Sequence, residues 1–174
     1  MKDREAFIKY LYVTEQYRPG YKHSVGFAPG GVSFGTLTPK VELYSIYSLI
    51  TGTPSDLDDQ KLFDFIPGYK IMTLEDIAAS LDRFENKGLV PFLSNYSGDF
   101  MCVYNDAVVS VLHDDPAIVE YSSSVGSFFL TVISMYEEGV FFVGGDGYLD
   151  YDFDRELIVG KRLNPNSSYW NYPV

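Results

Sequence analysis

Gly88–His113 reads GLVPFLSNYSGDFMCVYNDAVVSVLH, and this stretch decides the fold. Three apolar segments of strand length follow one another in it: Leu89–Leu93, Phe100–Tyr104 and Ala107–Leu112. Asn105-Asp106, between the last two, fits a two-residue hairpin loop because both residue types tolerate a positive φ. The stretch therefore predicts an antiparallel meander. Its apolar runs are nearly continuous rather than alternating, which predicts a sheet covered by helices.

The segments on either side of the meander have the apolar spacing of helices. Helices are predicted from Asp3 to Gln16, from Thr38 to before Gly52, from Thr73 to before Gly88, from Ser124 to about Glu138 and from about Asp152 to Arg162. Thr73 and Asp76 fit a capping box at the third of these helices. A short strand is predicted at Ala117–Tyr121 and a hairpin at Val140–Tyr151.

These elements predict an α+β fold. Its sheet is curved and mostly antiparallel, its central meander covers about residues 89–121, and helices pack beside it. The length of 174 residues suits one domain over residues 1–174, large enough to bury a full core. Trp170 is predicted to anchor the C-terminal tail.

The net charge of −11 is unevenly distributed along the chain. Residues 1–87 contain 10 Lys/Arg and 12 Asp/Glu, a balance of −2, whereas residues 88–174 contain 3 and 12, a balance of −9. No Lys or Arg occurs between Gly88 and Asp154. This balance argues against nucleic acid or an anionic membrane as direct partners, because both bind basic surfaces. A basic protein partner and simple solubility are both compatible with it.

The chain shows no signal-peptide core and no apolar stretch long enough to span a membrane, so we expect a cytoplasmic protein. Cys102 is the only cysteine and lies inside an apolar segment. We expect a buried, inert thiol there rather than a nucleophile, since reactive thiols lie in accessible, electropositive surroundings.

No motif in the chain predicts catalysis, a metal or a cofactor. The two histidines, His23 and His113, have no zinc-site spacing around them. His113-Asp114-Asp115 could bind a metal or act as a base, but it also suits the turn after a strand. Asp150, Asp152 and Asp154 begin like a calcium loop, but Arg155 and Lys161 stand where Gly and Glu are needed. A pair of acids for glycoside hydrolysis stays open, because such pairs have no fixed spacing.

The order of the motifs resembles the SUKH superfamily, which includes the yeast glucan-synthesis-regulator family and many bacterial immunity proteins. The resemblance covers about residues 37–170. It is carried by Leu37-Thr38-Pro39 before a helix that ends at Gly52, by Ile71–Ile77, Leu89–Phe92, Ser97–Phe100 and Val109–Asp115, by Ser122–Glu138 with Phe128 and Phe129, and by Leu163–Trp170.

The resemblance implies an α+β fold without catalysis and without a cofactor. It implies a binding module, in bacteria an immunity protein that neutralises a cognate toxin, which is often a nuclease. The acidic second half agrees with a basic toxin domain as the partner. A regulatory scaffold for cell-envelope synthesis or signalling is the alternative that the yeast branch suggests, and an acid-pair hydrolase is a third.

The partner surface is predicted to be acidic with exposed aromatic side chains, because basic residues are absent from this part of the chain. Its residues are Asp114, Asp115, Glu120 and Tyr121, together with Asp146, Asp150, Asp152 and Asp154 from the hairpin and the helix that follows. An ordinary solvated edge is the alternative interpretation of the same residues.

Overall fold

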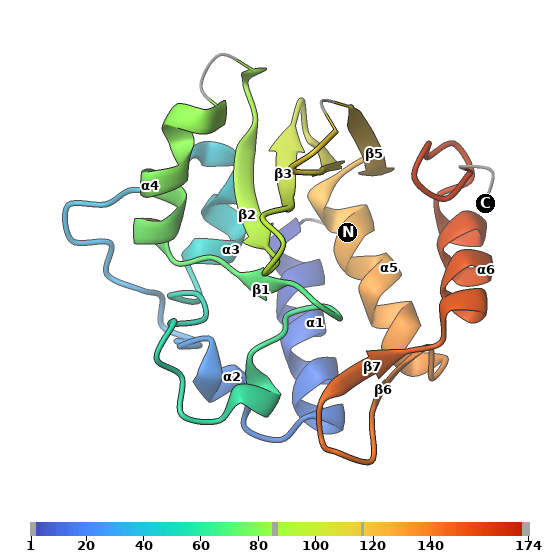
Figure 1. Ribbon diagram of the computed structural model, residues 1–174. Coiled ribbons are helices and arrows are strands. Elements are labelled where there is room, and N and C mark those ends of the chain that lie inside the picture. The colour runs from blue at the N-terminus through green and yellow to red at the C-terminus, as the bar shows by residue number, and fades with distance from the viewer. Residues whose placement is uncertain (1–2, 85–86, 116, 172–174) are drawn as a thin grey trace.

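The computed structural model describes residues 3–84, 87–115 and 117–171 (Figure 1). Its α-helices are α1 (Asp3–Tyr17), α2 (Tyr21–Ser24), α3 (Tyr44–Tyr47), α4 (Leu74–Phe84), α5 (Val125–Glu137) and α6 (Phe153–Leu163). The described residues also form the 3₁₀ turns η1 (Val41–Leu43) and η2 (Gln60–Leu62). The strands are β1 (Lys70–Ile71), β2 (Val90–Ser94), β3 (Phe100–Tyr104), β4 (Ala107–Val111), β5 (Ile118–Ser122), β6 (Phe141–Val143) and β7 (Leu149–Tyr151).

The five strands β1–β5 form one antiparallel sheet in chain order, and β6 and β7 form a separate hairpin. The predicted α+β meander is therefore confirmed. Asn105 and Asp106 have φ values of 47° and 69°, as a tight two-residue hairpin requires. Four of the five residues in each of β2, β3 and β4 are buried, which confirms a sheet covered on both faces.

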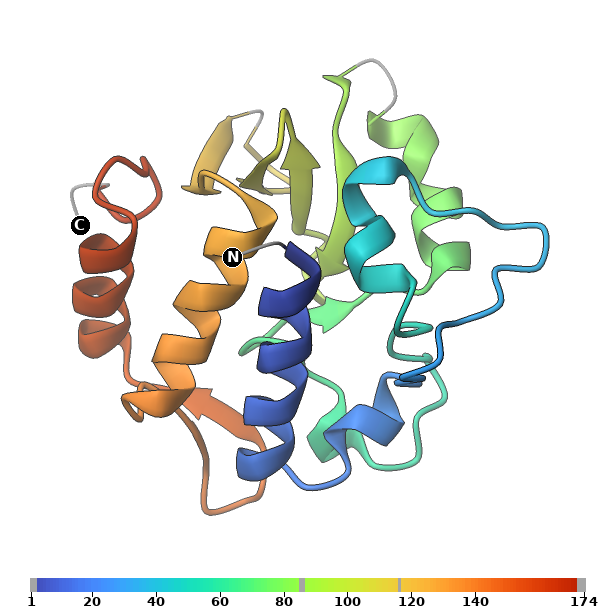
Figure 2. The same ribbon diagram turned by 180° about the vertical axis from the view of Figure 1, so that it is seen from behind.

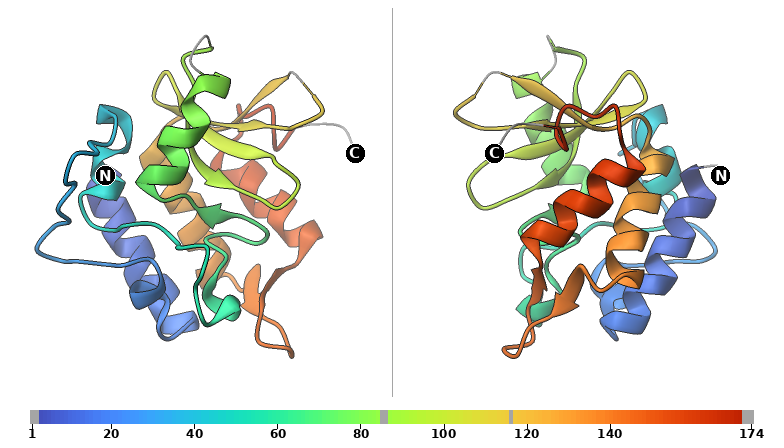
Figure 3. Two further views of the ribbon diagram at one scale, coloured as in Figure 1. Left: turned by 60° about the vertical axis from the view of Figure 1, so that its left-hand side comes forward. Right: turned by 90° about the vertical axis from the view of Figure 1, so that its right-hand side faces the viewer.

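Successive side chains of a strand point to opposite faces of the sheet, so the apolar runs put apolar side chains on both faces. Helices cover both faces. On one face, the ring of Phe84 from α4 lies 5.1 Å from that of Phe100. On the other, the ring of Phe128 from α5 lies 5.7 Å from that of Phe92. Helix α5 lies between α1 and α6 (Figure 2), and α4 lies across the sheet from this layer (Figure 3).

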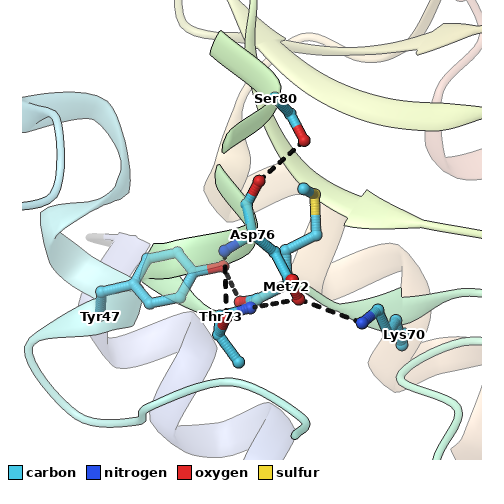
Figure 4. A network of polar contacts seen from close by, with 6 residues as sticks. All are labelled: Tyr47, Lys70, Met72, Thr73, Asp76 and Ser80. Atoms are coloured by element: carbon cyan, nitrogen blue, oxygen red, sulfur yellow. Dashed lines mark hydrogen bonds and ion pairs between the residues drawn. The ribbon is translucent and has the colours of Figure 1, made fainter. Parts of the chain in front are cut away.

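The capping box at the start of α4 is confirmed. The Asp76 amide donates to Thr73 Oγ1 (3.1 Å), and the Thr73 amide donates to Asp76 Oδ2 (3.4 Å). Lys70 of β1 donates to the same carboxylate oxygen at 3.0 Å, and the Tyr47 hydroxyl donates to the Met72 carbonyl at 2.6 Å (Figure 4). These bonds join α3, β1 and α4 into one unit.

The helix predicted from Thr38 is wrong in its start and its length. Lys40 precedes η1, no side chain caps it, and the helical region ends with the single turn of α3. Beyond that turn, the Ala28 amide donates to the Leu49 carbonyl at 2.8 Å, so the chain leaves the helix to pair with a distant loop. The predicted apolar positions are buried all the same: Leu43, Ile46, Tyr47 and Ile50.

The C-terminal tail is anchored as predicted. The Trp170 indole N–H donates to the Tyr121 carbonyl at 3.0 Å. Its ring lies directly on Gly160 of α6, where an added Cβ would lie 2.2 Å from the ring. None of the described helices combines the length and apolar content that a membrane crossing needs. The predicted turn at 114–116 includes Pro116, which lies outside the described residues.

Candidate functional site

The structure divides the predicted acidic surface into two separate parts. Asp114 and Asp115 lie in the connection from β4 to β5, at one end of the molecule. Asp146–Asp154 lies on the β6–β7 hairpin and the start of α6, at the opposite end (Figures 1 and 3). The prediction of one surface built from both segments is therefore wrong, since the sheet and α5 separate them.

Basic side chains lie beside the first of these parts. Asp114 and Asp115 line a depression of about 340 Å³ together with Arg83 and Lys87, which come from α4 and the residues after it. The expectation of a surface free of Lys and Arg is thus wrong at this turn. The absence of cations from residues 88–154 was a property of the sequence, and the fold supplies cations from an earlier segment.

His113 pairs with an acid other than its two neighbours in sequence. Its Nδ1 lies 2.8 Å from Asp99 Oδ1, and its amide donates to the same oxygen at 2.9 Å. Partial burial opposes ionisation of Asp99, but hydrogen bonds from His113 and Asn95 lower the pKa of this carboxyl. No group of three His, Cys, Asp or Glu side chains in the described parts of the chain could hold a metal ion. These contacts favour the structural interpretation of His113-Asp114-Asp115.

Tyr121 does not lie on the surface. It is 1% exposed, and its ring contacts those of Phe128, Tyr169 and Trp170 at 4.7 to 5.5 Å. The prediction of an exposed partner contact at Tyr121 is wrong because the C-terminal tail covers β5. Glu120, the residue before it, is half-buried, and its carbonyl accepts from the Ser167 hydroxyl at 2.6 Å.

The predicted acids of the hairpin make local hydrogen bonds. Asp146 accepts from the Tyr148 amide at 3.1 Å, and Asp150 accepts from the amide of the next residue at 2.8 Å. Asp152 caps α6 by accepting from the Arg155 amide at 3.1 Å. Asp146, Asp150 and Asp154 are nevertheless exposed, so this end of the molecule presents carboxylates to solvent.

Exposed apolar side chains gather on the same hairpin and helix. Seven of the fifteen large exposed hydrophobic side chains found among the described residues lie there: Phe142, Val143, Tyr148, Tyr151, Phe153, Ile158 and Leu163. We call this set, together with Asp146, Asp150 and Asp154, the hairpin surface. Exposed aromatic side chains were predicted from the sequence for this surface, but the residues that supply them were not named. A signal existed, because a two-stranded hairpin that is apolar at successive positions can bury only one of its two faces.

A small cavity of about 100 Å³ opens beside the hairpin surface. We call it the aromatic pocket. Its floor is formed by buried side chains, namely Ile66, Met101, Tyr121 and Phe141, and its rim by half-buried or exposed ones, namely Pro67, Tyr69, Tyr151, Glu156 and Tyr169. This pocket could not be predicted from the sequence, because its lining residues, from Ile66 to Tyr169, come from segments that are distant along the chain.

One polar atom of the aromatic pocket lacks a hydrogen-bond partner among the described residues. The Tyr121 hydroxyl is fully buried and has no hydrogen-bond partner there. Burial is the main cause that raises the pKa of this hydroxyl, and Glu156, Tyr169 and Tyr69 add to it. All four residues line the pocket. Burial alone raises the pKa of the Glu156 carboxyl to about 7. The arrangement can accept a hydrogen-bond donor or a positive charge.

The raised pKa of Glu156 predicts a pH-dependent stability. Between its ordinary pKa of 4.5 and about 7, the folded protein keeps a proton that the unfolded chain has lost. The contribution of Glu156 to the free energy of unfolding is therefore fully present below about pH 4.5 and is lost as the pH rises through about 7. We expect Glu156→Gln to remove this loss, which amounts to about 1 kcal/mol after allowance for solvent screening.

Urea unfolding at several pH values between 4.5 and 8 measures this effect as the difference between wild type and variant. Asp154→Asn is the matched control, because it removes the same charge from the same helix outside the pocket. Identical profiles for wild type and Glu156→Gln would contradict the prediction.

Compared with known proteins, the chain matches no protein-family model and no curated protein. The resemblance to the SUKH superfamily therefore depends on the order and spacing of its motifs and stays a prediction.

Proposed function

We propose that this chain is a non-enzymatic protein-binding module that neutralises a basic toxin domain. The observation that carries the proposal is the set of exposed aromatic and aliphatic side chains along β6, β7 and α6, which alternate in the chain with exposed carboxylates. Exposed apolar groups in one region are typical of protein-binding sites, and buried aromatic anchors supply much of the binding energy of an interface.

The charge of the chain supports a basic partner. A net charge of −11 accelerates association with a positively charged protein, and complementary charge is typical of inhibitors that must bind quickly. Of the two parts of the predicted acidic surface, the hairpin surface is the better candidate. It carries exposed apolar side chains besides its carboxylates, whereas cations lie near both parts: Arg83 and Lys87 beside Asp114 and Asp115, and Lys61 beside Gly147 of the hairpin.

The resemblance to the SUKH superfamily supports neutralisation as the purpose of the binding. A co-expression rescue tests it: the C-terminal domain of each large protein encoded beside this gene is induced with and without this chain. Restored growth, together with a stable complex on gel filtration, is the expected result. Killing despite abundant expression of this chain would reject neutralisation of that domain, and a harmless neighbour would favour the regulatory-scaffold alternative.

Charge reversal maps the surface once a partner is in hand. We expect the double variant Asp150→Lys/Asp154→Lys to weaken the complex at least tenfold, because it places two cations against a basic partner. The matched control is Asp114→Lys/Asp115→Lys, which makes the same charge change at the opposite end and is expected to alter Kd less than twofold. Titration calorimetry at two salt concentrations gives the Kd of each double variant. A larger effect at Asp114 and Asp115 would reverse the assignment.

A further inference from the structure

The aromatic pocket is the size of one side-chain head group. Its volume of about 100 Å³ equals the space of about three water molecules, at about 30 Å³ each. Pockets for nucleotides and drug-sized ligands are larger, at roughly 300–1,000 Å³. The pocket therefore suits the end of a single side chain that enters from outside.

The chemistry of the lining selects a positive charge. Five of the nine lining side chains are aromatic, and the electron-rich faces of such rings attract cations. Glu156 adds a carboxylate, and no Lys, Arg or His is found among the described lining residues. An anion would meet the carboxylate unfavourably. A metal ion would find one carboxylate and phenolic hydroxyls, a poor donor set for the common metals.

Two polar groups of the pocket are in an unfavourable state that a bound cation would relieve. A buried hydroxyl without a partner is unfavourable, and the Tyr121 hydroxyl is in this state. The Glu156 carboxyl is half-buried, and among the described residues no cation offsets the burial that raises its pKa. An ammonium or guanidinium group carries several N–H donors and could satisfy both groups at once.

We propose that the aromatic pocket receives one lysine or arginine side chain of the basic partner, with Glu156 and the Tyr121 hydroxyl as its polar contacts. The proposal rests on the proposed function and gives it a specific anchor. The pocket adjoins the hairpin surface, since Tyr151 belongs to both and Glu156 lies on α6 with Phe153 and Ile158. A partner that covers the hairpin surface would thus reach the pocket.

The test uses the full chain and small probes that need no partner. n-Butylammonium represents the lysine head, n-propylguanidinium the arginine head, and n-pentanol is the neutral control. Amide chemical shifts and the fluorescence of Trp170 report binding. Trp170 is the only tryptophan, and its ring lies 4.7 Å from that of Tyr121 and 4.8 Å from that of Tyr169.

We expect at least one cation to bind saturably in the millimolar range, with shifts centred on the pocket, and pentanol to bind at least fivefold more weakly. Glu156→Gln should weaken the cation at least fivefold, whereas Asp154→Asn should leave it unchanged. Tyr121→Phe should weaken the cation without lowering the melting temperature, because the hydroxyl it removes has no partner in the protein. If the hydroxyl were merely structural, Tyr121→Phe would lower the melting temperature and leave cation binding unchanged.

Failure of this proposal is distinguishable from failure of the proposed function. No saturable cation binding, equal binding of pentanol, or an unaffected Glu156→Gln variant would overturn the pocket while leaving rescue of growth intact. Cation binding without rescue would retain the cation site and reject neutralisation. If rescue occurs but Glu156→Gln weakens the toxin complex less than twofold, the pocket is not the anchor.

Discussion

Replacing Arg18 by alanine is expected to lower the free energy of unfolding by about 3 kcal/mol. Arg18 follows α1 and is only 3% exposed. Its guanidinium donates to the carbonyl oxygens of Asp64 and Lys61, the latter at 2.9 Å, and lies 4.7 Å from the centre of the Tyr21 ring. Alanine would leave two carbonyls without their donor and would open a space between α1 and the segment after η2.

Urea unfolding followed by circular dichroism measures this loss. Arg4→Ala is the control, because Arg4 is an exposed arginine of α1, the helix that Arg18 follows, and its removal is expected to change stability by less than about 0.5 kcal/mol. Arg18→Lys should give an intermediate loss, since lysine keeps the charge but lacks the planar fork of donors. Equal stabilities of Arg18→Ala and Arg4→Ala would show that the buried guanidinium contributes little.

Gly52→Ala is expected to cost about 3 kcal/mol or more, because neither the backbone conformation nor the space allows a side chain. Gly52 has a φ of +93°, and an added Cβ would lie 2.4 Å from the Met72 carbonyl oxygen and 2.8 Å from Thr73 Cα. That carbonyl accepts the Tyr47 hydroxyl at 2.6 Å (Figure 4), so it cannot move away without breaking this bond.

The control for this variant separates the close contact from the positive φ. Gly35 has a φ of +56° and no atom within 4 Å of an added Cβ. Gly35→Ala should therefore cost only about 1 kcal/mol, the penalty of the left-handed conformation itself. Urea unfolding of both variants isolates the steric part as their difference. Equal losses would mean that the Met72–Thr73 backbone yields at little cost.

The sequence alone was sufficient for the parts of the fold that depend on neighbouring residues. The meander followed from three apolar runs and the tolerance of Asn105-Asp106 for positive φ, and both were confirmed. The starts of α4 and α6 followed from Thr73 and Asp152, whose side chains bond to amides three residues later. In each case the deciding interaction spans only a few positions, so the local pattern contains the necessary information.

Only the tertiary structure decided the features that depend on segments far apart in the chain. Leu49 pairs with Ala28, and this pairing shortened a helix that its own sequence favours. Arg83 and Lys87 lie beside Asp114 and Asp115, so a charge pattern along the chain did not become the same pattern on the surface.

Tyr121 shows the same dependence at the candidate site. Trp170, 49 positions away, packs over Tyr121 and donates to its carbonyl. Tyr121, which was predicted to lie on the surface, is therefore buried. The same packing makes Tyr121 part of the lining of the aromatic pocket, together with Glu156. Local preference selects helices, turns and strands, but burial depends on which distant segment covers a residue, and this is determined only when the whole core has packed.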